Sequence, residues 1–238
     1  MLTRTRPLVE VAVDSVVSAV MAAGLGADRL ELCQDLELGG TTPSFGLLEA
    51  VLERVSIPVV VMIRPRPGDF VYGPEDLRVM EADVRHAVRA GAGGVVVGPL
   101  TAEAGIDQDG LKRLVLAAGP AQVTFHRAFD LVGDPLRALD VLVRNGVVRL
   151  LTSGGGTTAD AGRAVIGRLV EQAGPRLAVM AGGGVVAEHV AGLVAATGVR
   201  EIHLSGIVLR PAVGAGFGMT PVPNPARLSR VMDVLRGS

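Results

Sequence analysis

Short apolar runs recur along the chain, separated by longer segments in which apolar side chains return every three or four positions. The short runs are rich in Val, Leu and Ile, which is typical of buried strands, whereas the longer segments have the period of helices that bury one face. Strands are expected at residues 8–13, 29–33, 59–63, 94–97, 122–125, 149–152, 177–180 and 201–204. Helices are expected at residues 15–24, 45–55, 75–90, 109–118, 135–145, 159–173, 187–197 and 224–236.

This regular alternation predicts parallel strands joined by right-handed helical crossovers. Eight such units favour a closed (β/α)8 TIM-type barrel, so residues 1–238 are predicted to form a single domain. Residues 206–223, rich in Gly and Pro, are expected to form a loop before the last helix. An open doubly wound sheet is the alternative, but it favours a Gly-x-Gly-x-x-Gly turn after the first strand, where this chain has Val13-Asp14-Ser15-Val16.

Composition narrows the possible partners. With 49% hydrophobic and 20% charged residues, the 238-residue chain is too apolar for disorder. The formal net charge is −1 and the basic residues are scattered, which argues against nucleic acid or an anionic membrane as a partner. We therefore expect a small ligand or another protein.

Cysteine usage and hydropathy indicate the compartment. Cys33 is the single cysteine, which rules out an internal disulfide and fits a reducing environment. Glu10 and Asp14 interrupt the first apolar stretch, and no uninterrupted apolar run of about 18 residues occurs. We expect a cytoplasmic protein without a membrane span.

The predicted strand at 122–125 continues directly into the charged residues His126, Arg127 and Asp130. Functional groups of (β/α)8 barrels lie at the carboxyl ends of the strands, so this segment is a candidate active site. His126 is a candidate general acid or base, with a hydrogen-bonded structural role as the alternative. Asp130 is a candidate catalytic carboxylate, and Arg127 is a candidate anion-binding cation.

Glu10 and Glu31 lie within apolar predicted strands. A carboxylate in such a strand either faces into the barrel or pairs with a cation, because unpaired burial of a charge is costly. Both are candidate catalytic residues. The alternative is a structural ion pair with Arg64 or Arg127.

Arg64 and Arg66 follow the strand at 59–63 and are one residue apart, with Pro65 and Pro67 stiffening the backbone. On an extended chain both side chains point to the same face, where they would form a fork for a carboxylate or phosphate. The alternative is a rigid loop held by salt bridges to Asp69.

Glycine-rich turns follow the last three predicted strands. Barrels often bind phosphate on backbone N–H groups after strands seven and eight, and glycine permits the close approach; tight turns are the alternative explanation. The candidate anion-binding residues of these turns are Ser153, Gly182, Gly183, Gly184 and Ser205.

Sequence signals for a metal site are few. The chain has no Cys-x-x-Cys, no His-Glu-x-x-His and no His pair at helical spacing. Cys33 is the candidate metal ligand, although a lone cysteine is most often a small buried apolar residue; Met62 is a candidate second sulfur. His203 is flanked by apolar residues and is a weaker site candidate.

Five segments in order resemble the CutC copper-homeostasis family. They are Gly-Ala-Asp-Arg-Leu-Glu-Leu-Cys at 26–33, Gly-Gly-Thr-Thr-Pro-Ser at 39–44, Ile-Arg-Pro-Arg at 63–66 with Gly-Asp-Phe after it, Thr-Phe-His-Arg-Ala-Phe-Asp at 124–130, and Leu-Thr-Ser-Gly at 151–154. The resemblance extends roughly from Glu10 to Ser205.

This resemblance implies a cytoplasmic (β/α)8 barrel with an assigned role in copper homeostasis, present as a homodimer or larger homo-oligomer. It also implies copper ion binding as Cu(I), at cysteines that include a pair at the end of the first strand and another in the second. Here the first-strand positions are Ala12 and Val13, and only Cys33 matches.

Two functions therefore remain open. One is a copper-homeostasis binding protein. The other is an enzyme that acts by proton transfer on a small anionic or phosphorylated metabolite at the mouth of the barrel. In the second, Arg64 and Arg66 would hold the anion, residues 182–184 would hold phosphate, and His126 with Glu10 or Glu31 would move a proton.

Overall fold

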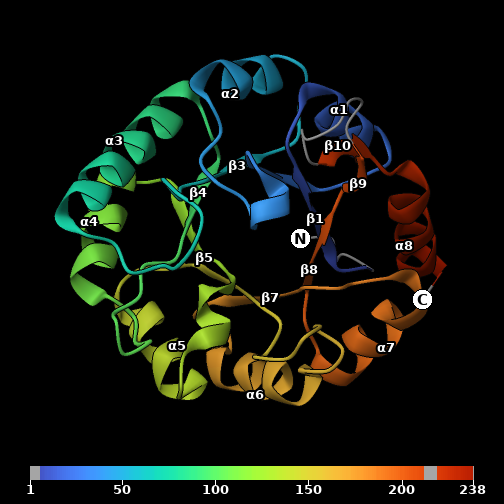
Figure 1. The fold of residues 1–238 in the computed structure, drawn as a ribbon. Helices are drawn as coiled ribbons and strands as arrows, with labels where there is room; N and C mark the ends of the chain where they lie inside the picture. Colours follow the sequence, from blue (N-terminus) through green and yellow to red (C-terminus); the bar gives the residue numbers. More distant parts are fainter. Residues whose placement is uncertain (1–5, 212–218, 238) are drawn as a thin grey trace.

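The computed structural model of the chain describes residues 6–211 and 219–237. Eight parallel strands form a closed barrel in chain order, because β1 pairs with both β2 and β8, and the helices form a ring around it (Figure 1). The predicted (β/α)8 barrel is confirmed, and the open doubly wound sheet is excluded. The barrel strands are β1 (Leu8–Val13), β2 (Arg29–Leu32), β3 (Val59–Met62), β4 (Gly94–Val97), β5 (Gln122–Phe125), β6 (Arg149–Thr152), β7 (Ala178–Gly182) and β8 (Glu201–Ser205).

The helices bury one apolar face against the outside of the barrel. In α3 the buried residues Leu77, Met80, Val84 and Ala87 recur at helical spacing. In β1 the side chains of Val9, Val11 and Val13 point outward from the barrel and are fully buried beneath the helices. The helices are α1 (Val16–Gly24), α2 (Phe45–Leu52), α3 (Pro74–Ala90), α4 (Gln108–Ala118), α5 (Pro135–Arg144), α6 (Arg163–Ala173), α7 (Ala187–Thr197) and α8 (Pro225–Gly237), with 3-10 turns η1 (Leu36–Leu38) and η2 (Arg127–Leu131). None of the described helices is both long and apolar enough to cross a membrane.

The sixth helix begins later than the expected residue 159. Residues 159–162 form a turn beneath the end of β6, and a Cβ on Gly162 would lie only 1.9 Å from the carbonyl oxygen of Ser153. This close approach of two backbones requires glycine, and it delays the first helical turn to Arg163.

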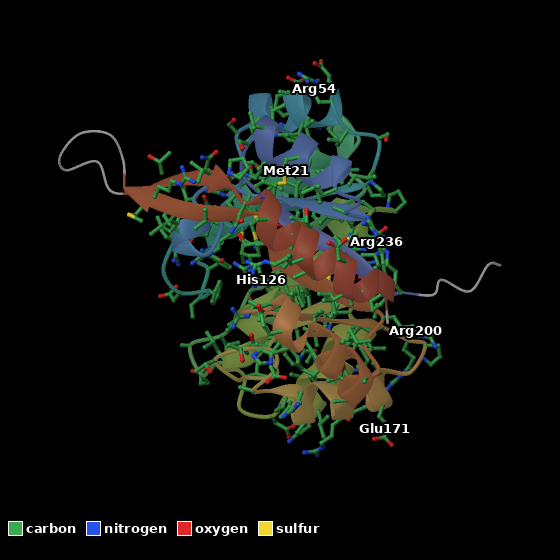
Figure 2. The ribbon with its side chains drawn as sticks, turned by 90° about the vertical axis from the view of Figure 1, so that its right-hand side faces the viewer. Met21, Arg54, His126, Glu171, Arg200 and Arg236 are labelled. Carbon is green, nitrogen blue, oxygen red and sulfur yellow. The ribbon has the colours of Figure 1, made fainter. Side chains whose placement is uncertain are left out.

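Residues 206–223 were predicted to form a Gly/Pro-rich loop, and this prediction is wrong for the part that the structure describes. It contains two antiparallel strands, β9 (Ile207–Pro211) and β10 (Met219–Pro223), paired from Ile207 with Pro223 to Pro211 with Met219. Ile207, Val208, Thr220 and Val222 are β-branched residues that favour strands, and the prolines are tolerated because both strands of a two-stranded ribbon are edge strands. Figure 2 shows the ribbon projecting past the barrel on the left. Residues 212–218 lie outside the described part.

The inside of the barrel is divided into an ionic part and an apolar part. Arg29 joins the carboxylates of Glu10 and Glu201, and Arg149 binds the same Glu201 with Nε 2.6 Å from Oε2. On β3 and β4 and directly after β2, a small apolar cluster forms from Val60, Met62, Val96 and Cys33. The buried charges are therefore paired within the barrel rather than with the solvent.

Candidate functional site

A cavity of about 600 Å³ opens at the carboxyl ends of the strands. Its lining includes η1, the ends of β1, β2, β3, β5 and β8, the turn after β7, β9 and the first turn of α8. η1, the short blue turn near the middle of Figure 1, lies over this mouth. In Figure 2 the labelled His126 lies toward the side on which β9 and β10 project. The barrel mouth thus contains a cavity that is large enough for a small ligand.

His126 follows β5 and lies against the cavity. Its Nδ1 accepts the backbone N–H of Ala128 at 3.1 Å, so the ring proton of the neutral imidazole is on Nε2. Nε2 is buried without a hydrogen-bond partner among the described residues. Burial, reinforced by the charge of Arg64, lowers the pKa of His126 to about 3. His126 therefore presents a neutral N–H donor, and with this tautomer it does not offer Nε2 as a metal ligand.

The position of His126 depends on its neighbours. A Cβ on Gly98, at the end of β4, would lie 2.0 Å from His126 Cε1, so glycine provides the space for the ring. The ring of Phe70 packs on the imidazole at 5.0 Å between centroids. The donor is consequently held in one orientation.

Asp130 is not free to act as an acid or base. Its carboxylate accepts the N–H groups of Ser153 and Gly155 and the hydroxyls of Thr152 and Ser153, and it pairs with Arg127 Nε at 2.9 Å. All the lone pairs of the carboxylate are engaged, so Asp130 positions Arg127 and the turn after β6. Ser153 is fully buried and serves the same turn, since it does not line the cavity.

Arg127 and Arg64 both reach the cavity, but their guanidinium groups donate hydrogen bonds to different partners. Arg127 donates through Nε to Asp130 and through Nη2 to Ser153 Oγ at 3.1 Å. Arg64 donates to the carbonyls of Leu38, Gly40 and Gly68 at 2.8–2.9 Å, which joins two loops. Its buried Nε has no partner in the described chain.

The fork expected from Arg64 and Arg66 does not form. Arg66 points away from the cavity and bonds Asp69, Asp76 and the carbonyl of Val71. The turn after β3 departs from extended backbone, so residues one apart no longer share a face. Arg66 matches the rigid-loop alternative.

Glu10, Glu31 and His203 form a buried group at the cavity floor. His203 Nδ1 lies 2.8 Å from Glu10 Oε1, and Nε2 lies 3.7 Å from Glu31 Oε2. The partner of Glu10 is Arg29, on the adjacent β2, rather than Arg64 or Arg127, which were the expected cations. Glu31 and His203 line the cavity, while Glu10 lies beneath them.

The protonation of this group follows from its contacts. Burial opposes ionisation of Glu10, but the hydrogen bond with His203 and the charge of Arg29 prevail and lower its pKa to about 2. Burial raises the pKa of Glu31. Burial disfavours charge on His203, yet the two carboxylates outweigh it and raise the pKa of the imidazole.

Cys33 lies just outside the cavity. Its thiol is fully buried, donates to Glu31 Oε2 at 3.5 Å, and has a pKa raised well above the usual value by burial and by that carboxylate. A Cβ on Gly40 would contact both Cys33 Sγ and Met62 Cε, so the two sulfur-bearing side chains are neighbours. The structure thus places one thiol, that of Cys33, next to one thioether, that of Met62.

The glycine turn after β7 contributes to the wall. Gly183 and Gly184 line the cavity with φ of +102° and +65°, whereas Gly182 packs inside the barrel beside His203. A Cβ on Gly183 would lie 3.0 Å from Arg127 Cζ, so its absence lets the guanidinium rest on the backbone. Ser205 also lines the cavity, and its hydroxyl accepts the N–H of Ile207.

Sequence reasoning missed Arg227 and undervalued His203. Arg227, in the first turn of α8, donates through Nη2 to Val185 O at 3.1 Å. Its Nε is buried at the cavity wall and has no hydrogen-bond partner within residues 6–211 and 219–237. Its helical pattern gave no sign of this position. His203 could have been found, because β8 pairs with β1 in a closed barrel and places it beside Glu10.

Known proteins resemble this chain over most of its length. A sequence profile described as the CutC family matches residues 7–208. A human protein named copper homeostasis protein cutC homolog is 47% identical over 222 residues, which cover 93% of this chain and 81% of the human protein. A family protein CutC from Pasteurella multocida is 45% identical over 198 residues, covering 83% of this chain and 81% of that protein.

Solved structures of other proteins have the same fold as this chain. A crystal structure of a CutC protein from Streptococcus agalactiae has a TM-score of 0.78 and 36% identity, covering 83% of this chain and 97% of that one. A thiamine phosphate pyrophosphorylase from Pyrococcus furiosus has a TM-score of 0.62 at 16% identity, covering 98% of this chain and 96% of that one, and shares the fold alone.

Proposed function

Because the chain belongs to the CutC family, we propose that it acts in copper homeostasis in the cytoplasm. The observation that carries this proposal is the 47% identity, over 93% of the chain, with a human protein named for that role. A cytoplasmic location suits Cys33, a free thiol. Copper sensitivity of cells lacking this chain, rescued by its expression, tests the role; normal copper tolerance would contradict it.

The donor set fits a closed Cu(I) site poorly. Cu(I) prefers thiolate and thioether ligands, and here Cys33 and Met62 are the two candidates, since Ala12 and Val13 carry no sulfur. Binding would also remove the proton from a buried thiol whose pKa is raised. We propose that the role in copper homeostasis does not depend on a tight Cu(I) site.

A Cu(I) competition titration against a calibrated chelator, in excess glutathione, tests this point. Wild type, Cys33→Ser and Met62→Leu are compared, with Met80→Leu as the control because Met80 is a buried methionine in α3. We expect the chelator to retain the copper in every case. Stoichiometric binding that is lost in Cys33→Ser and kept in Met80→Leu would establish direct copper binding instead.

The cavity favours a second candidate function, the binding and conversion of a small anionic ligand. Arg127 and Arg227 line one wall together with Gly183 and Gly184. His126 lines the same space, and its Nε2–H has no partner in the described part of the chain. Two guanidiniums and a neutral donor around about 600 Å³ suit a phosphate or carboxylate.

Calorimetric titration with inorganic phosphate and with glycolate tests the anion site. We expect binding that weakens at least about tenfold in Arg127→Met or Arg227→Met, since each removes one charge-assisted contact of about 1.5–3 kcal/mol. Arg66→Met is the matched control, because Arg66 lies outside the cavity. No binding of either anion to wild type would reject this function.

We also propose that the chain forms a homodimer or larger homo-oligomer. Large apolar side chains are exposed on several helices, including Val17, Phe45, Val79 and Leu116. A second copy of the chain would remove some of this surface from water. Light scattering during gel filtration tests the proposal, and a monomer mass at all concentrations would contradict it.

A further inference from the structure

The floor of the cavity holds a carboxylate with one oxygen uncommitted. Glu31 Oε2 accepts the Cys33 thiol at 3.5 Å and lies 3.7 Å from His203 Nε2. Its other oxygen, Oε1, is buried without a hydrogen-bond partner among the described residues. A buried polar atom without a partner is costly, so Oε1 is suited to a group brought in by a ligand.

His203 is fixed so that it can exchange a proton with Glu31. Glu10 remains ionised, because Arg29 and His203 both bind it, so His203 Nδ1 donates to Glu10. Nε2 then carries a proton only when the imidazole is charged. Glu31 and His203 together form an acid–base pair whose nearest atoms are 3.7 Å apart, so a small movement of one side chain brings them to the distance at which a proton passes between them.

The wall of the same cavity provides a donor for an oxygen atom. The Nε2–H of the neutral His126 ring is buried and has no partner among the residues that the structure describes, and Phe70 and Ala128 fix the ring. A neutral imidazole of this kind stabilises a developing oxyanion without transferring its own proton.

The remaining wall provides cationic groups for anchoring. Arg127 is held by Asp130 and Ser153, and Arg227 is held by the carbonyl of Val185. Both guanidiniums are therefore preorganised before a ligand arrives, which lowers the entropic cost of binding.

We propose that the cavity catalyses proton transfer at the carbon beside the carbonyl of a small compound that carries a phosphate or carboxylate. This inference rests on the anion site proposed above. Glu31 as carboxylate removes the C–H proton, the C–H electron pair forms a C=C bond, and the carbonyl electrons move to the oxygen, which accepts a hydrogen bond from His126. The Glu31–His203 pair holds the proton and returns it to the product, so no oxidant or further reactant is needed.

A divalent cation is the competing occupant of the floor. Ligand atoms of Glu10, Glu31 and His203 lie within 4.8 Å of one another. Arg29, however, already places a fixed positive charge on Glu10, which disfavours a second cation there. The geometry favours proton transfer by the side chains alone.

Hydrogen exchange in D2O, followed by proton NMR, tests the proposal on the full chain. Glycolaldehyde phosphate is the phosphate probe and hydroxypyruvate is the carboxylate probe, each with an exchangeable proton beside a carbonyl. We expect wild type to accelerate exchange into one probe at least about tenfold over buffer, which corresponds to about 1.4 kcal/mol. The responding probe identifies the anionic group.

The variants separate this inference from the anion site itself. Glu31→Gln should abolish exchange while phosphate or glycolate binding persists, His126→Gln should reduce it, and Arg66→Met should leave it unchanged. Anion binding without exchange into either probe would overturn the proton-transfer proposal and leave the anion site standing. Exchange that stops with a chelator and returns with Mn²⁺ would overturn the assignment to side chains alone.

Discussion

The imidazole of His203 and the carboxylate of Glu10 are joined by a 2.8 Å contact between the last and the first strands of the barrel. Arg29, on the second strand, binds the same carboxylate. Three strands that are adjacent only in the closed barrel thus share one buried ionic group. Removing one member therefore takes a buried partner away from each of the side chains that it contacts.

Glu10→Gln is expected to lower the free energy of unfolding by about 1.5–3 kcal/mol, because Arg29 loses one of its two buried anions and keeps Glu201. The pKa of His203 should fall, since Glu10 helps to raise it. Urea unfolding and NMR titration of the imidazole measure the two effects. Glu49→Gln on the exposed face of α2 is the control and should change stability by less than about 0.5 kcal/mol; equal stability of both variants would contradict the prediction.

His126→Gln is expected to make the free energy of unfolding less dependent on pH in mild acid. The pKa of His126 is about 3 in the folded chain and 6.5 ordinarily, so its contribution is present above pH 6.5 and is lost as the pH falls toward 3, at about 1.4 kcal/mol per pH unit. Glu10 titrates later, between its ordinary 4.5 and about 2.

Urea unfolding between pH 6.5 and pH 4.5 therefore isolates His126. Glu31 contributes to the pH dependence of stability in the opposite direction, because its pKa is raised. This contribution is the same in wild type and variant, so it cancels when their slopes are compared. His189→Gln, at an exposed position in α7, is the matched control for the substitution itself. Parallel slopes for wild type and His126→Gln would show that His126 is charged in the folded chain.

Arg64→Met is expected to loosen the two loops that Arg64 joins. The guanidinium donates to the carbonyls of Leu38, Gly40 and Gly68, and we expect a loss of about 2–4 kcal/mol. Faster amide exchange in both loops should accompany it. Arg66→Met removes partly exposed ion pairs and should cost less than about 1 kcal/mol; similar losses in both variants would contradict the role of Arg64.

Gly183→Ala is expected to weaken phosphate binding several-fold. The new Cβ would meet Arg127 Cζ at 3.0 Å, and the backbone φ of +102° strains any other residue by about 1–2 kcal/mol. Gly198→Ala is the control, because Gly198 has φ of +69° but ends α7 away from the cavity. A loss of affinity in both variants, as measured by calorimetry, would mean that strain alone is responsible.

Cys33 is expected to react slowly with iodoacetamide in the native chain. The thiol is fully buried and its pKa is raised, so little thiolate is available. Unfolding in urea should restore ordinary reactivity. Rapid alkylation of the native chain would show that the cavity floor opens to solvent.

The barrel and most of its elements were predictable because the chain alternates short apolar runs with amphipathic segments. The ends of β5 and β8 also placed His126 and Ser205 at the mouth correctly. Arg66 was misplaced because the Pro-containing turn leaves the extended conformation, which sequence spacing assumes. The pairing of Glu10 with Arg29 depends on strand register, which apolar patterning alone does not specify.

The ribbon and Arg227 were unpredictable for a different reason. Glycine and proline around β9 and β10 read as a loop, and pairing between the two strands is a long-range property. Arg227 lies directly after this ribbon, in the first turn of α8, where it contacts the carbonyl of Val185 at the cavity wall.

The pairing of β1 with β8 also bears on synthesis at the ribosome. One neighbour of β1, the strand β2, is synthesised directly after it, but the other neighbour, β8, is synthesised only after β3 to β7. Arg227, which completes the cavity wall, emerges later still. A nascent chain can therefore hold folded βα units early, yet we expect it to gain ligand affinity only after the final helix leaves the exit tunnel.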